Sequence, residues 1–510
     1  MSPRNLLLSL TLFVFATAGL RAQGQVTGEL QKWHRIQILF DGPQTSESAS
    51  QNPFLNYRLN VLFTAPDGRE FTVPGFFAAD GNAAESSATS GNKWAVRFSP
   101  DQVGTWTYTA SFRTGDEVAI SLDPNAGTAT GFDGASGSFQ IGLSTKSAPD
   151  NRSKGRLEYV GERYLRFREN GTYFLKAGAD SPENLLAYAD FDNTVASKTW
   201  SPHLGDWQQG DAEWKNGKGR ALIGAVNYLA SKGMNAFSFL TMSVIGDGKD
   251  VWPWVSTTHS GLDEPGGQDA ANRLRYDVSK LEQWEILFQH ADSKGMFLHF
   301  KTQEEENDRL LDGGELGVQR KLYYRELVAR FGHHLALNWN LGEENDLYDE
   351  LGDTNNTRVR AYASYIKSLD PYNHHIVIHS YPNSQSELYE PLLGDSDLTG
   401  PSLQIQINNI HRDVKRWIND SKASGKQWVV TNDEQGDHTT GVAADASYGG
   451  DKGSRGDNRS DVRHKTLWGH ADGRRGRSGI LLRVPDGCHR PHCRRLAQPK
   501  DKMGRCQAGP

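Results

Sequence analysis

Alternating apolar and polar residues dominate the chain from residue 25 to about residue 145. Period-two patterning, or enrichment in β-branched and aromatic residues, marks HRIQILFDG (34–42), NYRLNVLFTAPDGREFTVPGFFA (56–78), KWAVRFSPDQVGTWTYTASFRTG (93–115) and GSFQIG (137–142). Such runs, separated by Gly, Pro and Asp, are typical of β-strands joined by tight turns. The sequence APDGREF (65–71) predicts a hairpin turn. Because helical periodicity is almost absent here, the pattern predicts an immunoglobulin-type β-sandwich over residues 25–145.

The pattern changes after a polar linker, STKSAPDNRSKG (144–155). From residue 156 to residue 469, apolar strand-like runs alternate with longer stretches of helical periodicity. The seven predicted strands are YFLKAGAD (173–180), MNAFSFLTM (234–242), MFLHFKTQ (296–303), LALNWNLGEEN (335–345), HIVIHSY (375–381), SLQIQIN (402–408) and QWVVTNDEQG (427–436). This repetition predicts a parallel sheet, and a (β/α)8 barrel in preference to an open doubly wound sheet. No glycine-rich phosphate loop occurs, so no nucleotide cofactor is expected.

The first 22 residues have the features of a secretory signal. Arg4 precedes the apolar run LLLSLTLFVFATAGL, and cleavage after Ala22 is plausible, although a buried apolar helix is the alternative. We therefore expect a secreted or periplasmic protein. No other apolar run approaches the roughly 18 residues of a membrane helix. The three cysteines all lie after residue 487, which excludes a disulfide-stapled scaffold for the rest of the chain.

The net charge and the aromatic content limit the classes of binding partner that we expect. The formal net charge is −6, which argues against nucleic acid. Thirteen Trp and 17 Tyr provide flat amphipathic rings that suit either core packing or stacking on sugar faces. The composition therefore argues against a nucleic-acid partner and leaves both uses of the aromatic rings open, and it predicts no oligomeric state.

Polar side chains gather where the predicted parallel strands end. In a (β/α)8 barrel these carboxyl-terminal strand ends carry the chemistry. The residues at these ends are Asp180, Thr241, His299, Gln303, Glu304, Glu306, Glu343, Glu344, Asn345, His379, Tyr381, Gln404, Gln406, Asp433 and Glu434. Strands four and seven lie on roughly opposite sides of an eight-strand ring, so their carboxylates face each other. Cleavage of a glycosidic bond needs such a pair, one acid and one carboxylate.

Two strand-end motifs carry a family resemblance. WNLGEEN (339–345) and WVVTNDEQG (428–436) resemble the fourth- and seventh-strand motifs of clan A retaining glycoside hydrolases. From residue 30 to about residue 470, the chain resembles secreted bacterial proteins that join a β-sandwich of uncharacterised role to an apiosidase-like or cellulase-like barrel. The resemblance implies that Glu344 is the general acid/base and Glu434 the nucleophile. Because Glu343 stands where these enzymes usually have Asn, either member of the Glu343–Glu344 pair can be the acid, and Asp433 can compete with Glu434.

Ten other residues are candidates for holding substrate: Asp180, Trp252, His299, Gln303, Glu304, Glu343, Asn345, His379, Tyr381 and Gln404. Several of these residues also have a less specific interpretation. Trp252 and Trp254 fit a stacking platform or the core equally well. The two histidines fit hydrogen-bonded packing positions, and the run QEEEND (303–308) fits a solvated charged surface. No metal site is predicted, because CHRPHC (488–493) matches none of the usual zinc-ligand spacings.

The last 41 residues differ from the rest of the chain. Residues 470–510 hold ten Lys and Arg against three Asp and Glu, and they contain no pattern typical of an eighth strand; ILL (480–482) is short and flanked by arginines. A shifted reading frame can encode a strand-like VEYYFGY there instead. We therefore predict that this basic tail is out of frame, and that the eighth strand is missing or corrupted unless GILLRV (479–484) enters its place.

The sequence thus predicts a secreted glycoside hydrolase with a retaining two-carboxylate mechanism and no cofactor. The alternative is a non-catalytic extracellular protein that binds polysaccharide or mediates adhesion on the same scaffold.

Overall fold

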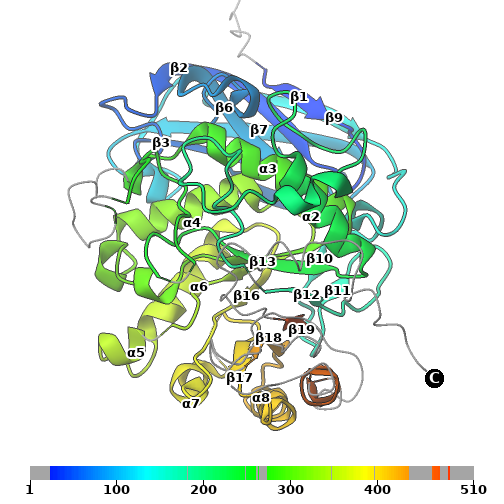
Figure 1. Ribbon diagram of the computed structural model, residues 1–510. Coiled ribbons are helices and arrows are strands. Elements are labelled where there is room, and N and C mark those ends of the chain that lie inside the picture. The colour runs from blue at the N-terminus through cyan, green and yellow to red at the C-terminus, as the bar shows by residue number, and fades with distance from the viewer. Residues whose placement is uncertain are drawn as a thin grey trace, which may run out of the picture.

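The protein consists of an antiparallel β region followed by a parallel α/β region (Figure 1). The computed structural model describes residues 23–180, 182–246, 248–259, 262, 273–345, 347–394, 397–435, 462–470 and 480–482. The predicted signal segment, residues 1–22, lies outside the described residues. Among the helices described, none has the length and apolar character needed to cross a membrane.

Two antiparallel sheets build the N-terminal region. The first has the order β1 (Gln25–Gly28), β2 (Ile36–Ser46), β6 (Ser90–Phe98), β5 (Phe76–Phe77). The second has the order β4 (Glu70–Pro74), β3 (Tyr57–Thr64), β7 (Gly104–Thr114), β8 (Thr128–Ala129), with β9 (Ser136–Ile141) also on β7. A short helix, α1 (Ala83–Ser86), precedes β6, and the predicted hairpin joins β3 to β4.

Aromatic rings hold the two sheets face to face. Phe63 of one sheet stacks on Phe98 of the other with ring centroids 4.4 Å apart, and Trp106 meets Phe98 edge to face at 5.1 Å. Burial alternates along β7, where Trp106, Tyr108, Ala110 and Phe112 face the interior. The period-two pattern therefore separates a buried from an exposed face, as a half-buried strand requires.

The C-terminal region is built on eight parallel strands. Their spatial order is β16 (His375–Val377), β15 (Leu337–Asn340), β14 (Phe297–Lys301), β13 (Ala236–Leu240), β12 (Ala177–Ala179), β19 (Ile480–Leu482), β18 (Thr431–Gln435) and β17 (Ser402–Ile405). The two end strands also meet, because the Ser402 amide donates to the Ile378 carbonyl at 3.0 Å and His379 bridges to Ser402. The sheet therefore closes on itself, and we call it the strand ring.

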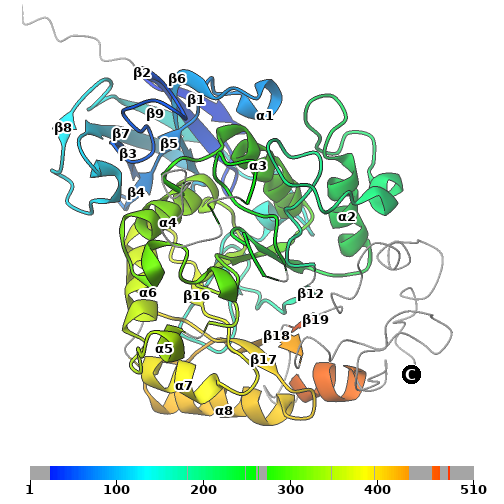
Figure 2. The same ribbon diagram turned by 60° about the vertical axis from the view of Figure 1, so that its left-hand side comes forward.

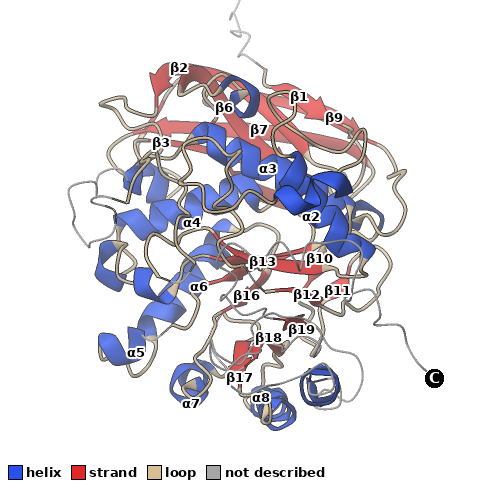
Figure 3. Cartoon of the chain, in the orientation of Figure 1, coloured by secondary structure: helices blue, strands red, loops and turns tan. Residues whose placement is uncertain are grey.

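Helices alternate with these strands and cover the outside of the ring (Figure 3). The long ones are α2 (Arg220–Ser231), α3 (Val278–Ser293), α4 (Val318–Phe331), α6 (Thr357–Leu369) and α8 (Ile410–Ala423), each within or close to a predicted helical stretch. Shorter elements are α5 (Leu347–Glu350), α7 (Gln385–Tyr389), a π-helix (Val462–Trp468), the small hairpin of β10 (Leu157–Glu158) and β11 (Arg166–Phe167), and 3-10 turns at Val118–Ile120, Asn151–Ser153, Ser201–Asp206, Glu305–Asn307, Asp312–Gly314 and Glu390–Leu392. The predicted α/β alternation is confirmed.

The eighth position of the ring is occupied by β19, the alternative that the sequence offered to a missing strand. Ile480–Leu482 pairs along Ala177–Ala179 of β12 and meets β18 at Asn432. A parallel ring with an open slot would leave backbone N–H and C=O groups unpaired, and even a three-residue strand satisfies part of that demand. Of the GILLRV segment, the described residues Ile480–Leu482 lie in this slot, as the alternative prediction allowed. The frameshift itself stays a prediction, since the rest of the basic tail lies outside the described residues.

The antiparallel region packs against α3, α4 and the loops beside them (Figures 1 and 2). Phe54 meets Tyr276 edge to face at 5.4 Å, and Phe98 stacks on Tyr372 at 6.1 Å. Arg97 of β6 is buried at this contact and pairs with Glu282 of α3. The two regions thus share one apolar core, and an ion pair between the buried Arg97 and the partly exposed Glu282 joins them.

Replacing Arg97 tests how much this interface contributes. We expect Arg97→Ala to lower the free energy of unfolding by about 3 kcal/mol, because Glu282 would keep only its 3.5 Å contact with Arg330 and the buried Glu285 would lose its 3.6 Å contact with Arg97. Lys93→Ala on the same strand is the control: its pair with Asp41 is exposed and should contribute less than about 1 kcal/mol. Urea unfolding followed by tryptophan fluorescence measures both, and equal effects would contradict the interface assignment.

Candidate active site

Charged side chains converge at the carboxyl-terminal edge of the strand ring. Asp180 directly follows β12, Lys301 ends β14, Glu343 follows β15 and Glu434 lies in β18. Parallel strands end at the same edge, so residues distant in sequence come together there. Neighbouring loops hold them in place: the Glu343 amide donates to the Gln303 carbonyl at 2.9 Å, and Ser238 of β13 donates to the Asp180 carboxylate at 2.7 Å.

Four carboxylates form one buried group, which we call the acid cluster: Asp180, Glu183, Glu343 and Glu434. One oxygen from each lies within 4.8 Å of an oxygen of every other, and all four residues are buried. Four negative charges at such distances repel one another strongly in a medium of low dielectric constant. The cluster therefore needs positive charge, bound protons, or both.

Lys301 supplies positive charge to the acid cluster. Its ammonium nitrogen lies 3.1 Å from Asp180 Oδ1 and 3.4 Å from Glu183 Oε1, and it also pairs with Glu343 Oε1. Burial opposes the charge of Lys301, but the carboxylates of Asp180, Glu343 and Glu183 raise the pKa of this ammonium well above its usual value. Lys301 is therefore a fixed cation and a poor nucleophile.

Glu343 is a member of the acid cluster that is suited to hold a proton. Burial raises the pKa of the Glu343 carboxyl well above its usual range, the Glu183 carboxylate adds to the shift, and the Lys301 ammonium offsets part of it. A carboxylic acid that stays protonated near neutral pH can donate a proton to a leaving group.

Glu434 faces the cluster because β18 contains a bulge. Leu403 pairs with Asn432 but Gln404 pairs with Glu434, so Asp433 is an extra residue. In a regular strand, neighbouring residues point to opposite faces, and a bulge relaxes that rule. The side chain of Gln404 donates to Glu434 Oε1, and His379 Nε2 lies 3.8 Å from Glu434 Oε2.

Asp433 points into the same ring but belongs to a deeper layer. Its carboxylate pairs with the Lys176 ammonium at 2.7 Å and accepts hydrogen bonds from Ser402 at 2.7 Å and Thr431 at 2.9 Å. His299 contacts Lys176 at 2.8 Å through Nδ1 and Asn340 at 3.1 Å through Nε2. Asp433 and His299 are therefore engaged one layer below the acid cluster, which leaves Glu434 as the β18 carboxylate within it.

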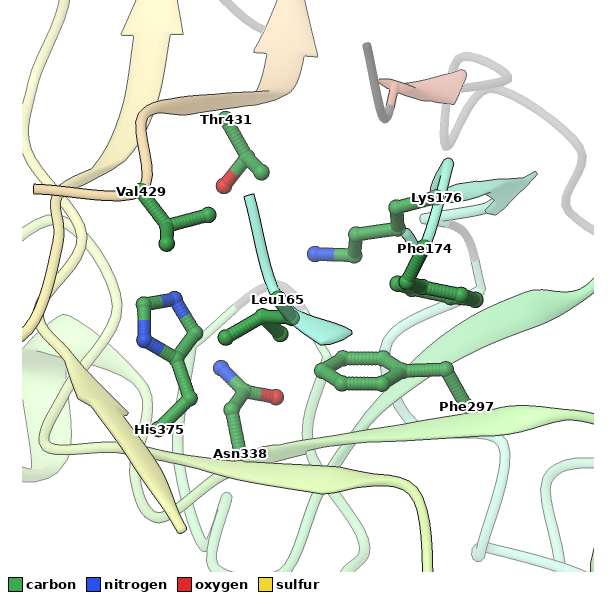
Figure 4. Close-up of a pocket in the computed structure, with 8 residues that line it drawn as sticks. All are labelled: Leu165, Phe174, Lys176, Phe297, Asn338, His375, Val429 and Thr431. Atoms are coloured by element: carbon green, nitrogen blue, oxygen red, sulfur yellow. The ribbon is translucent and has the colours of Figure 1, made fainter. Parts of the chain in front are cut away.

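A cavity of about 10 Å³ lies below this layer, near the amino-terminal ends of the strands (Figure 4). It is lined by Leu165, Phe174, Lys176, Phe297, Asn338, His375, Val429 and Thr431. This volume is roughly what a single water molecule needs. It lies at the end of the ring opposite the acid cluster and is too small for a sugar, so it is not the candidate site.

Glu344 adopts a different environment from Glu343. Its backbone φ is +43°, an unusual conformation for a residue with a side chain, and its amide donates to His379 Nδ1 at 3.2 Å. Its side chain is half-buried and does not belong to the acid cluster. Of the two glutamates left open by the sequence, Glu343 is the one grouped with Glu434.

The remaining predicted residues surround this group or lie behind it. Gln303 and Asn345 both bind Asp308, which links the loops after β14 and β15. Glu304 is buried, and burial with the nearby Glu183 and Glu306 carboxylates raises the pKa of its side chain well above its usual range. Trp252 is 2% exposed and donates to the Ser256 carbonyl at 2.6 Å, so its ring is packed in the core. Tyr381 is half-buried, just beyond the end of β16.

Sequence analysis missed Glu183 and Lys301. Lys301 lies on the same face of β14 as Phe297 and His299, which precede it at two-residue spacing. The alternation in the sequence could therefore have predicted that Lys301 faces inward with His299. Glu183 lies in a loop, where sequence periodicity does not predict which way a side chain points. The Leu240 amide donates a hydrogen bond to the Glu183 carbonyl at 2.9 Å and holds this loop residue in place.

Comparison with known proteins places the chain among glycoside hydrolase folds. Residues 29–113 match a domain of unknown function (DUF5060). A search of curated proteins finds no match. A candidate glycoside hydrolase from Bacteroides vulgatus ATCC 8482 has a similar structure, with a TM-score of 0.55 and 15% identity over 89% of this chain and 71% of that one. At this identity the likeness establishes the fold alone.

Weaker structural similarity extends to two further glycoside hydrolases. A family 5 glycoside hydrolase from the same Bacteroides has a TM-score of 0.42 and 13% identity over 67% of this chain and 65% of that one. A family 2 β-galacturonidase from Eisenbergiella tayi has a TM-score of 0.39 and 12% identity over 91% and 64% of the two chains.

Paired substitutions test the assignment of Asp433 and Glu434 to different layers. We expect Asp433→Asn to lower the free energy of unfolding by about 3 kcal/mol or more, since Lys176 would remain buried without its counter-ion. Glu434→Gln removes one of several crowded negative charges, so stability should be unchanged or higher. Urea unfolding at pH 7 measures both variants. A larger loss for Glu434→Gln than for Asp433→Asn would contradict the two-layer arrangement.

Proposed function

We propose that the protein is a secreted glycoside hydrolase that acts on a polysaccharide or oligosaccharide with retention of configuration. In this proposal the strand ring is a (β/α)8 barrel of the clan A type, and the antiparallel region is an immunoglobulin-type sandwich. The observation that carries the proposal is the approach of Glu343 and Glu434 to within 4.8 Å across the ring. Retaining enzymes hold their two carboxyl groups about 5–5.5 Å apart, whereas inverting enzymes need roughly 6.5–9.5 Å for an intervening water.

The two glutamates then divide the reaction between them. Glu434 attacks the anomeric carbon as a carboxylate while Glu343 gives its proton to the leaving oxygen, which forms a covalent glycosyl-enzyme. Glu343, now ionised, removes a proton from water, and the water displaces Glu434. The hydrogen bond from Gln404 orients the Glu434 carboxylate, and the raised pKa of Glu343 keeps its proton available.

Other residues at this edge support the proposal as substrate contacts. Asp180, Glu304, Tyr381 and Asn345 follow the ends of four different strands. Sugar hydroxyl groups require such a ring of acceptors and donors. The signal-like first 22 residues support export, and a polymeric carbohydrate outside the cell is the corresponding substrate class.

Three matched amide variants test the assignment. Glu343→Gln and Glu434→Gln should each lower kcat/KM by at least about 10²–10⁴-fold, because each removes a group that reacts in the transition state. Glu344→Gln should retain most of the activity, since its carboxylate is outside the acid cluster. Hydrolysis of a polysaccharide and aryl-glycoside panel by the full chain is the assay, and proton NMR of the first product reports its configuration.

The outcomes separate the proposal from its rivals. Loss of activity in Glu344→Gln with retention in Glu343→Gln would exchange the roles of the two glutamates. An inverted first product would exclude the covalent intermediate. Binding of a polysaccharide without any hydrolysis would favour the non-catalytic binding protein.

A further inference from the structure

Lys301 contacts Glu343 in a way that distinguishes the two oxygens of that carboxyl group. Glu343 Oε1 pairs with the Lys301 ammonium, whereas Glu343 Oε2 is buried and makes no hydrogen bond to the described residues. An oxygen that faces an ammonium group is a poor position for a proton, because the two positive charges would meet. The proton of Glu343 therefore belongs on Oε2.

Charged and titratable groups approach Glu343 from every neighbouring element. Asp180 and Glu183 come from the loop after β12, Lys301 and Glu304 from β14 and its loop, and His379 and Glu434 from the ends of β16 and β18; Glu344 is the next residue in the chain. Most of these groups are carboxyls, which favour the protonated form of Glu343. Lys301 acts in the opposite sense, since a cation favours the carboxylate.

Resting on the function proposed above, we propose that Lys301 and Glu183 are positioning residues that set, from opposite directions, the pH range over which Glu343 keeps its proton. Lys301 also directs that proton to Oε2. Glu183 is suited to the opposing role because its carboxylate is buried in the same cluster and shares Lys301 with Glu343. Neither residue takes part in bond cleavage.

The proposal predicts shifts of opposite sign in two variants. In a retaining enzyme the alkaline limb of the kcat/KM profile reports loss of the acid's proton. Lys301→Met removes the nearby cation, so the limb should move to higher pH by on the order of one unit. Glu183→Gln removes a nearby anion, so the limb should move to lower pH by a similar amount. Lys301→Arg keeps the charge and should leave the limb close to that of the wild type.

A measurement without substrate tests the same charges independently. The pKa of Glu343 in the folded protein lies above its value in the unfolded chain, so the folded state binds more protons between those two values, and stability falls as pH rises through that window. Melting temperatures of the full chain at a series of pH values, from the usual carboxyl range upward, give this slope. The fall should be steeper in Lys301→Met and shallower in Glu183→Gln.

The two measurements separate failure of this inference from failure of the proposed function. If the wild type hydrolyses nothing while the two slopes change in opposite directions, the charge assignment holds and the proposed hydrolase activity is wrong. Limbs or slopes that move in the same direction in both variants, or not at all, would overturn the inference. If Lys301→Met does not fold, Glu183→Gln still decides the matter, because an unmoved limb and slope in that variant contradict it.

Discussion

Charge neutralisation inside a closed ring of strands is the constraint on which the rest of this structure depends. An interior surrounded by β-strands and helices has a low dielectric constant, so an isolated ion there is very unfavourable. Inside the strand ring, two buried lysines lie against carboxylates: Lys176 against Asp433, and Lys301 against Asp180, Glu183 and Glu343. The deeper pair is balanced one to one. The outer group holds an excess of carboxyls; burial raises the pKa of the Glu343 carboxyl, and the nearby Glu183 carboxylate adds to that rise.

The strand pattern made much of the fold predictable. Period-two runs located the antiparallel strands, and apolar runs alternating with helical stretches located β12 to β18 with their helices. These features follow from local periodicity, which a sequence records directly. The polar residues at strand ends were predictable for the same reason, because parallel strands bring their carboxyl ends to one edge.

The details of the site were less predictable because they depend on backbone irregularities. The positive φ of Glu344 and the bulge at Asp433 decide which carboxylate of each adjacent pair enters the acid cluster, and neither has a clear sequence signature. One of the Lys301 ion pairs is made by Glu183, which lies in a loop. Sequence periodicity does not predict where a loop side chain points. The eighth strand could be offered only as an alternative, because three apolar residues between arginines are too short for a strand pattern.

The bulge in β18 has a consequence for how this site can change by mutation. With the extra residue, Asp433 and Glu434 both point inward, one to each polar layer. Deleting Asp433 would restore regular pairing but remove the carboxylate that pairs with Lys176, and deleting Asn432 would place Asp433 opposite Leu403, on the other face of the strand. A one-codon deletion there would thus leave Lys176 without its counter-ion, whereas point substitutions alter one layer at a time. Residues in this segment can therefore be substituted during evolution, but the segment cannot be shortened without disrupting a polar layer. The length of the segment matters to the site as much as its side chains do.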